Sequence, residues 1–362
     1  MNDTEDAARP APAVDRIVEE AWEQVIGARP GRNDRLLRLL ANEDPGLGRS
    51  YQIGLLLSEI AATTDVHLPL TVAYASPTAA ELARMVQAPE TVRYLRPVSV
   101  KPGTGEGLFV FPGIGGIGLD VLGLARHLSF PGPVYLDPPR GVDGAEPDRT
   151  LSDVVADHIA CIRRVQPSGP YWLLGSSWGG LVGLEVSRAL RTAGERIAFV
   201  GMIDPILNQS DWTASAWLQF VSVRFAYHLK ELRRMRSPAA VARYIGKRIV
   251  PVVDKLLRPF GITGLWPLTE AGDELPAPLA AIWSAESVII KQYRLHRYDG
   301  AVTLFATRAG HAGEVDPRKI WPPKVGRFDL VWVPGDHELT EPGVADTARA
   351  ISDTLARVRT AT

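Results

Sequence analysis

Apolar residues recur along this chain in two patterns, one near the N-terminus and one after it. In the first, they fall three or four positions apart and form one helical stripe, at Val14, Ile17, Val18, Ala21, Trp22, Val25 and Ile26. Two more helices are expected to follow, one starting at Ser50 and one opened by Ser76-Pro77-Thr78. The first ninety residues therefore indicate a small all-α helical bundle.

The second pattern consists of short, continuous apolar runs separated by helical stretches. The runs lie at residues 108–111, 171–174, 197–203, 302–305 and 330–333. Continuous apolar runs of this length are typical of buried strands, and their alternation with helices predicts a mostly parallel sheet. We therefore expect an α/β fold with a doubly wound, mostly parallel sheet, preceded by the small bundle.

A glycine-rich turn follows the second of these strands, and it reads Gly175-Ser176-Ser177-Trp178-Gly179-Gly180. The pattern G-x-S-x-G after a strand and before a helix is typical of a nucleophile elbow, in which glycines let the backbone cross closely. Ser177 fits the position of the nucleophile. Ser176 does not, because Leu174 stands two residues before it.

A serine nucleophile needs a base and an acid, which in this fold follow it in the order acid, then histidine. Asp204 ends the run 197–203, and His337 follows the run 330–333. His337 would take the proton of Ser177 while Asp204 holds its other ring nitrogen. His311 is the alternative base, and Asp336 is interpreted as a helix cap rather than the acid.

Acyl transfer also needs hydrogen-bond donors for the developing oxyanion. One is expected from the backbone N–H of Trp178, directly after the nucleophile, and the other from the loop after an early strand. Pro112-Gly113-Ile114-Gly115-Gly116 is such a loop, and Ile114 N–H is the predicted second donor. The same glycines do not complete G-x-G-x-x-G, which argues against a dinucleotide site.

Several motifs occur in a fixed order from about residue 108 onward. They are Phe111-Pro112-Gly113, Val165-Gln166-Pro167-Ser168-Gly169-Pro170-Tyr171, the elbow, Ala189-Leu190-Arg191-Thr192-Ala193-Gly194-Glu195, Met202-Ile203-Asp204 and Pro334-Gly335-Asp336-His337. Here the chain resembles the thioesterase domains that end nonribosomal peptide and polyketide synthases. The resemblance implies an α/β-hydrolase fold with a helical lid, and the same nucleophile, acid and base. Ser176 departs from the tryptophan or histidine frequent in that family.

Composition narrows the class of protein. The chain has 362 residues, 46% of them hydrophobic, and its net charge of −1 argues against nucleic acid as a partner. It contains no run of eighteen apolar residues, and it begins with polar, acidic residues, so a cytoplasmic protein without a membrane partner is expected. The single cysteine, Cys161, excludes an internal disulfide and a thiolate metal cluster, and no metal is expected.

The near-neutral total hides two segments of opposite charge. Residues 1–90 contain fourteen Asp and Glu against eight Arg, a net charge of −6, whereas residues 210–260 have a net charge of +7. A Pro/Gly-rich stretch after the first segment is typical of a linker. The expected organisation is a flexible N-terminus, a helical bundle, a linker and a hydrolase domain, with the bounds 1–12, 13–88, 89–106 and 107–362.

The N-terminal bundle resembles a phosphopantetheine carrier domain. The match rests on Val66-His67-Leu68-Pro69-Leu70, followed by Ser76-Pro77-Thr78 and Leu82-Ala83. It implies 4′-phosphopantetheine on Ser50, attached by a phosphopantetheinyl transferase. Gly46-Leu47-Gly48-Arg49-Ser50-Tyr51 departs from the usual Gly-Gly-Asp-Ser-Leu. A degenerate docking module and a plain helix cap at Ser50 therefore stay open.

Almost a hundred residues separate Asp204 from the next strand, too many for a plain loop. We expect a helical lid at about residues 208–296, over Ser177. Its basic residues could form a solvated face or attract an acidic carrier: Lys230, Arg233, Arg234, Arg236, Arg243, Lys247 and Arg248.

The sequence therefore predicts a thioesterase that releases an acyl or peptidyl chain from a phosphopantetheine carrier through an ester on Ser177. The expected partner is an acyl- or peptidyl-carrier domain of an upstream synthase, and release is by hydrolysis or cyclisation. Two other classes stay open, a free-standing carboxylesterase of the same fold and a non-catalytic docking scaffold for a synthase.

Overall fold

The computed structural model describes most of the chain. The described residues are 14–40, 47–92, 96–208, 211–223, 237, 275–308, 315–335, 337, 339 and 343–361.

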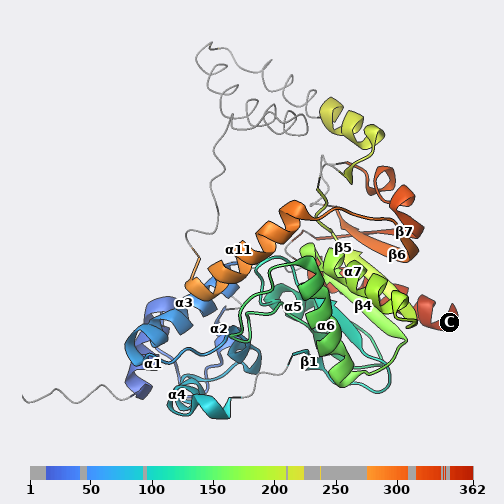
Figure 1. Ribbon diagram of the computed structural model, residues 1–362. Coiled ribbons are helices and arrows are strands. Elements are labelled where there is room, and N and C mark those ends of the chain that lie inside the picture. Colours follow the sequence, from blue (N-terminus) through green and yellow to red (C-terminus); the bar gives the residue numbers. More distant parts are fainter. Residues whose placement is uncertain are drawn as a thin grey trace, which may run out of the picture.

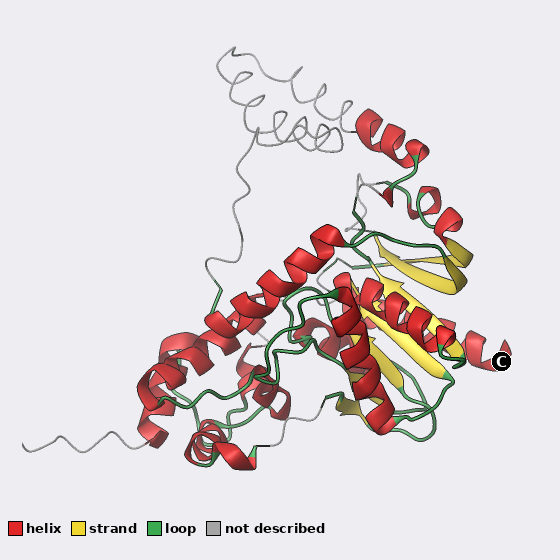
Figure 2. Ribbon diagram, viewed as in Figure 1, coloured by secondary structure: helices red, strands yellow, loops and turns green. Residues whose placement is uncertain are grey.

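A seven-stranded sheet forms the core of the hydrolase part, at the right in Figure 2. The strand order is β1-β3-β2-β4-β5-β6-β7, and only β1 runs antiparallel to its neighbour. The predicted strands are all present, which confirms the α/β fold class. The strands are β1 (Val98–Lys101), β2 (Leu108–Phe111), β3 (Val134–Leu136), β4 (Tyr171–Ser176), β5 (Ile197–Ile203), β6 (Tyr298–Thr307) and β7 (Val325–Val333).

Helices cover both faces of the sheet. Successive side chains of β2 point to opposite faces, and all of them are buried. Phe109 and Phe111 pack in one buried cluster with α6 (Leu151–Val165) and α7 (Trp178–Thr192). Leu108 and Val110 point the other way, toward α5 (Leu119–His127) and α12 (Gly343–Ala361). From β2 the chain passes to β3 on one side, whereas β4 to β7 follow on the other. The strand order therefore reverses beside β4, where doubly wound sheets place their ligands.

The N-terminal unit is the predicted helical bundle. Its elements are α1 (Val14–Ile26), α2 (Leu36–Leu39), α3 (Leu47–Thr64), η2 (Leu70–Ala75), α4 (Ala79–Gln87) and η3 (Pro89–Thr91). Buried Ile17, Val18, Ala21 and Trp22 confirm the apolar stripe of α1. Thr78 caps α4, because its hydroxyl accepts from Glu81 N–H while the Glu81 carboxylate accepts from Thr78 N–H.

The N-terminal unit packs against a long helix of the hydrolase part, α11 (Ala277–Gln292), which runs beside α3 in Figure 1. Contact is close at Gly54, where a Cβ atom would lie 2.9 Å from Leu279 Cδ1. The N–H of Thr71 also donates to Val142 O at 3.2 Å. One buried apolar cluster spans both parts. The two parts therefore share a core in this arrangement.

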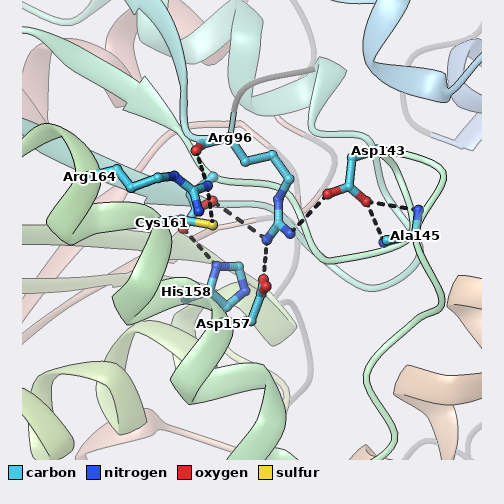
Figure 3. A network of polar contacts seen from close by, with 9 residues as sticks. Arg96, Asp143, Ala145, Asp157, His158, Cys161 and Arg164 are labelled. Atoms are coloured by element: carbon cyan, nitrogen blue, oxygen red, sulfur yellow. Dashed lines mark hydrogen bonds and ion pairs between the residues drawn. The ribbon is translucent and has the colours of Figure 1, made fainter. Parts of the chain in front are cut away.

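The segment expected to be a linker is partly structured. It contains β1 as the edge strand of the sheet, and Arg96, 3% exposed, lies within a cluster of acids (Figure 3). The Arg96 guanidinium lies 2.8 Å from Asp157, 3.6 Å from Asp143 and 3.7 Å from Asp137. Burial opposes the charged form, but these carboxylates outweigh it and raise the pKa of Arg96. The segment is thus tied to the hydrolase body, because a buried charge needs its counterions.

Cys161 and His158 lie beside this cluster on α6. The His158 ring nitrogen Nδ1 lies 2.8 Å from Asp137 Oδ2. Burial, together with Asp137, raises the pKa of the Cys161 thiol to about 12. An un-ionised, buried thiol is unreactive, so the interpretation of Cys161 as a packing residue is confirmed.

Candidate active site

Ser177 stands at a sharp turn between β4 and α7, in a strained backbone conformation with φ of 54° and ψ of −121°. The flanking glycines explain how the chain makes this turn. A Cβ on Gly175 would lie 2.1 Å from Gly179 O, and a Cβ on Gly179 would lie 2.2 Å from Pro112 O. Only glycine fits at either position, so the G-x-S-x-G pattern forms the predicted elbow.

His337 lies against the predicted nucleophile. It follows β7 in the sequence, and its ring nitrogen Nε2 is 3.2 Å from Ser177 Oγ, a hydrogen bond between residues 160 positions apart. The side chain of His337 is 44% exposed, so solvent reaches the imidazole. The parallel sheet brings the two residues together, because the C-terminal ends of β4 and β7 meet at one edge.

Asp204 lies behind the imidazole. Its Oδ2 is 3.8 Å from His337 Nδ1, which is an ion-pair distance and longer than a hydrogen bond. Asp204 follows β5 directly and adopts a positive φ of 40°. Its side chain is only 4% exposed. The structure therefore brings all three predicted side chains into one group, with the acid buried and the base at the surface.

Thr307, which the sequence analysis did not single out, fixes the Asp204 carboxylate. The N–H of Thr307 donates to Asp204 Oδ1 at 2.9 Å, and its hydroxyl donates to Oδ2. Thr307 ends β6, the strand that pairs with β5, and Ile203 lies opposite Phe305. The position at the end of the strand next to Asp204 was the available signal in the sequence.

The predicted oxyanion loop also borders Ser177. A Cβ on Gly113 would lie 3.4 Å from Ser177 Cβ, so the loop passes next to the nucleophile. Gly116 N–H donates to Gly113 O at 3.3 Å and closes a turn around Ile114. Trp178 is the first residue of α7, where backbone N–H groups have no acceptor within the helix. Both predicted donors therefore belong to segments that adjoin Ser177.

The remaining predicted residues lie elsewhere or outside the described residues. Ser50 is in the first turn of α3, which begins at Leu47 rather than at Ser50, and it is 4% exposed. Figure 1 shows α3 at the opposite end of α11 from β4 and β5. His311, Asp336 and the basic residues of 230–248 are not among the described residues. Of the expected lid, residues 214–223 and α11 are described, and both are helical.

The described residues form neither a cluster of metal ligands nor a membrane-spanning helix. They contain no group of three or more His, Cys, Asp or Glu side chains placed to hold a metal ion. Within the same residues, no helix has the length and apolar character needed to cross a bilayer.

The chain is similar in sequence to parts of two larger synthetases. The chain is 33% identical over 208 residues to malpinin synthetase from Mortierella alpina, a match that covers 56% of the chain and 3% of that protein. It is 38% identical over 108 residues to the inactive atromentin synthetase invA4 from Paxillus involutus, covering 29% of the chain and 11% of that protein. The chain thus spans a small part of the length of these relatives.

Among solved structures, the chain resembles holo-AB3403, a four-domain nonribosomal peptide synthetase bound to AMP and glycine. The TM-score is 0.53 at 19% identity, and the match covers 98% of this chain and 27% of that one. The likeness therefore extends over the helical unit as well as the sheet. The thioesterase domain model matches residues 106–354, more than half of the chain. The chain belongs to the thioesterase domain family.

Proposed function

We propose that the chain is a serine thioesterase that releases an acyl or peptidyl chain from a carrier-bound thioester in natural-product biosynthesis. The observation that carries the proposal is the 3.2 Å contact between His337 Nε2 and Ser177 Oγ at a strained elbow. A hydroxyl held against an imidazole in this way is arranged for nucleophilic catalysis. Membership of the thioesterase family supports the same reaction class.

In the proposed first half-reaction, Ser177 Oγ attacks the thioester carbonyl while His337 takes its proton. The carbonyl oxygen becomes an oxyanion that accepts from the N–H groups of Trp178 and Ile114. Collapse of this intermediate breaks the C–S bond, and His337 protonates the departing thiolate. The acyl chain is then an ester on Ser177. Asp204 stabilises the imidazolium, and we expect the 3.8 Å separation to shorten when substrate is bound.

In the second half-reaction, water or a nucleophile within the acyl chain attacks the ester. His337 removes the proton of the incoming group and returns it to Ser177 Oγ. Attack by water gives a free acid, whereas attack by an internal amine or hydroxyl gives a ring. The exposed imidazole is compatible with either. A cytoplasmic location is part of the same proposal.

The thioester donor is proposed to be an acyl- or peptidyl-carrier domain of an upstream synthase. The match to a four-domain synthetase over nearly the whole chain supports this choice. The N-terminal unit is proposed as a carrier-like module with phosphopantetheine on Ser50. Because Ser50 is buried on the α3 helix that packs against α11, it must leave this position to be modified. In the arrangement described here the donor is therefore an external carrier.

Trapping of the acyl-enzyme tests the proposal. The protein is incubated with a panel of acyl-N-acetylcysteamine thioesters, and the intact mass is recorded within the first turnovers. We expect one acyl increment, located on Ser177 by peptide mapping, and no increment in Ser177→Ala. Ser176→Ala is the matched control and should keep the increment. An adduct on Ser176, or thioester turnover in Ser177→Ala within about tenfold of the wild type, would contradict the assignment.

The wild type and Ser177→Ala also distinguish the thioesterase from the two alternatives, a carboxylesterase and a docking scaffold. A carboxylesterase would cleave short aryl esters faster than the thioesters. A docking scaffold would bind a carrier domain equally well before and after Ser177→Ala and would show no acyl increment. The scaffold is kept as a candidate because one relative of the chain is named an inactive synthetase.

A further inference from the structure

Helix α11 connects the N-terminal unit to the segments around Ser177. Its first turns pack on the N-terminal unit through Leu279, and its C-terminal end reaches α7, where Tyr293 meets Trp178 edge to face at 5.8 Å between ring centres. Tyr293 also donates its hydroxyl to Glu185 at 2.9 Å. Figure 1 shows the helix crossing between these two parts. Two side chains in the middle of α11, Trp283 and Glu286, contact the loop at residues 112–116.

One of these side chains is an acid. Glu286 is 6% exposed, and its Oε2 accepts from the backbone N–H of Gly115 at 2.6 Å. Gly115 has a φ of 61° and is the third residue of the turn that Gly116 N–H closes on Gly113 O. Glu286 thus holds a peptide group of the same turn that carries Ile114, the predicted oxyanion donor.

A second residue of α11 fixes the same peptide sterically. A Cβ on Gly115 would lie 2.5 Å from the indole ring of Trp283, one turn before Glu286. The Gly115 backbone therefore lies close to this ring. A glycine backbone is the most mobile in an unconstrained loop. The ring and the carboxylate together restrict that freedom.

Burial of a carboxylate is energetically unfavourable, and here its backbone partner is one N–H group, that of Gly115. Burial raises the pKa of Glu286 to about 7. The hydrogen bond from Gly115 N–H opposes this shift, because it favours the charged form of the carboxylate. The indole of Trp178 also favours it, although its N–H does not reach hydrogen-bond geometry, and Asp148 raises the pKa. An ionised acceptor bonds about twice as strongly as a neutral one and therefore holds its donor more rigidly.

We propose that Glu286 is a positioning residue for the oxyanion loop, holding Gly115 so that Ile114 N–H stays aimed at the oxyanion on the Ser177 adduct. The inference rests on the proposed acyl-enzyme chemistry. Preorganised donors act mainly in the transition state, where the negative charge develops. Loss of Glu286 should therefore lower kcat and leave KM nearly unchanged.

Glu286→Met tests the inference, because methionine has a similar length and no comparable acceptor. We expect kcat for an acyl thioester to fall about 30- to 100-fold, somewhat less than complete loss of an oxyanion donor. KM should stay within about threefold. An alkyl boronic acid forms a tetrahedral adduct with a serine, so its affinity should fall by a similar factor. Glu286→Gln keeps an uncharged acceptor and should lose only about three- to tenfold in kcat at pH 9.

Ile289→Ala is the matched control, since Ile289 is buried on the same helix, one turn further along. It should lower the melting temperature with kcat within about threefold of the wild type. Equal losses of kcat in Ile289→Ala and Glu286→Met would overturn the inference, as would a raised KM with unchanged boronate affinity. If the methionine variant does not fold, the glutamine variant decides, and a wild-type kcat at pH 9 overturns the inference.

The wild type separates this inference from the function on which it rests. If the wild type forms no acyl adduct on Ser177, the proposed function and the role of Glu286 fail together. If the wild type forms the adduct and both Glu286 variants match it in kcat, only the role of Glu286 fails.

Discussion

Thr307 holds the Asp204 carboxylate by two donors, its backbone N–H at 2.9 Å from Oδ1 and its hydroxyl on Oδ2. Oδ2 is also the oxygen that faces His337 Nδ1. The backbone and the side chain of Thr307 therefore both contribute to the orientation of the Asp204 carboxylate. Thr307 also stabilises the ionised carboxylate, which has little contact with solvent.

Thr307→Val should weaken catalysis without abolishing it. Valine keeps the shape of threonine and the backbone N–H but removes the hydroxyl that bonds Oδ2. Hydrogen bonds to charged groups are worth about 1.5–3 kcal/mol, so we expect kcat to fall about 10- to 100-fold. Steady-state thioester kinetics measure this. Thr303→Val, also buried in β6, is the control, and a Thr307→Val enzyme as fast as that control would contradict the role.

Asp204→Asn should be more damaging than Thr307→Val. An amide cannot stabilise the imidazolium, and it favours the wrong tautomer of His337, so the expected loss in kcat is about 10⁴-fold. His337→Ala removes the base itself and should approach the loss in Ser177→Ala. Single-turnover acylation rates test the order of these losses. An Asp204→Asn enzyme within tenfold of the wild type would show that another group orients the imidazole.

Local sequence rules were sufficient for five of the seven strands, all but β1 and β3, and for the grouping of Ser177, Asp204 and His337. Buried parallel strands have continuous apolar sequences. The residues that directly follow such strands lie at the same edge of the sheet, whatever the length of the segments that connect the strands. Ser177, Asp204 and His337 could therefore be placed together from their positions after strands. The strain at Ser177 was also implied, because the crossing of Gly175 and Gly179 excludes any side chain.

Contacts between distant segments could not be predicted in this way. Glu286 meets Gly115 across 171 positions, and a single acid in a helical run does not indicate which loop it will contact. Arg96 was included in a linker because prolines and glycines surround it. Its burial depends on Asp137, Asp143 and Asp157, which only the folded sheet brings together. The start of α3 at Leu47 was missed because Ser50 has the chemistry of a cap.

The stability of the protein should fall as Glu286 ionises. Its pKa in the folded chain is about 7, above the ordinary 4.5, so the folded state binds more protons between these values. The stabilising contribution is complete below pH 4.5 and is lost as pH rises through 7, a change of about 3 kcal/mol. Glu286→Gln does not titrate. We expect urea unfolding to show that the free energy of unfolding of Glu286→Gln rises relative to that of the wild type between pH 5 and 8. A difference in free energy that stays constant over this range would contradict the shifted pKa.

Arg96→Met should destabilise the chain strongly. Removing the cation leaves the buried carboxylate of Asp137 and the partly buried carboxylate of Asp157 without it, and breaking a buried ion pair from one side costs about 3–5 kcal/mol. Arg16→Met is the control, because Arg16 pairs with Glu20 on the surface at 2.7 Å. Its loss should lower the free energy of unfolding by less than about 0.5 kcal/mol. Urea unfolding at pH 7 compares them. Similar free energies of unfolding for the two variants would mean that the Arg96 cluster is neutral in stability.

The last prediction concerns access to Ser50. Ser50 and Gly54 lie four positions apart on one face of α3, and Gly54 touches Leu279 and Pro276. We therefore expect modification of buried Ser50 to require that α3 separates from α11. Gly54→Leu should wedge the helices apart, since even a Cβ would lie 2.9 Å from Leu279, while leucine favours the helix itself.

Incubation with coenzyme A and a phosphopantetheinyl transferase, followed by intact mass, gives the readout. We expect slow modification of the wild type, none of Ser50→Ala, and an initial rate at least about tenfold higher in Gly54→Leu, because the open population rises. Gly123→Leu is the control, a helical glycine with nothing within 4 Å of its added Cβ, and should match the wild type. Equal rates in Gly54→Leu and the wild type would show that packing on α11 does not limit access. No increment in either would remove Ser50 as an attachment site, because the exposed serine would then fail through its neighbours Arg49 and Tyr51.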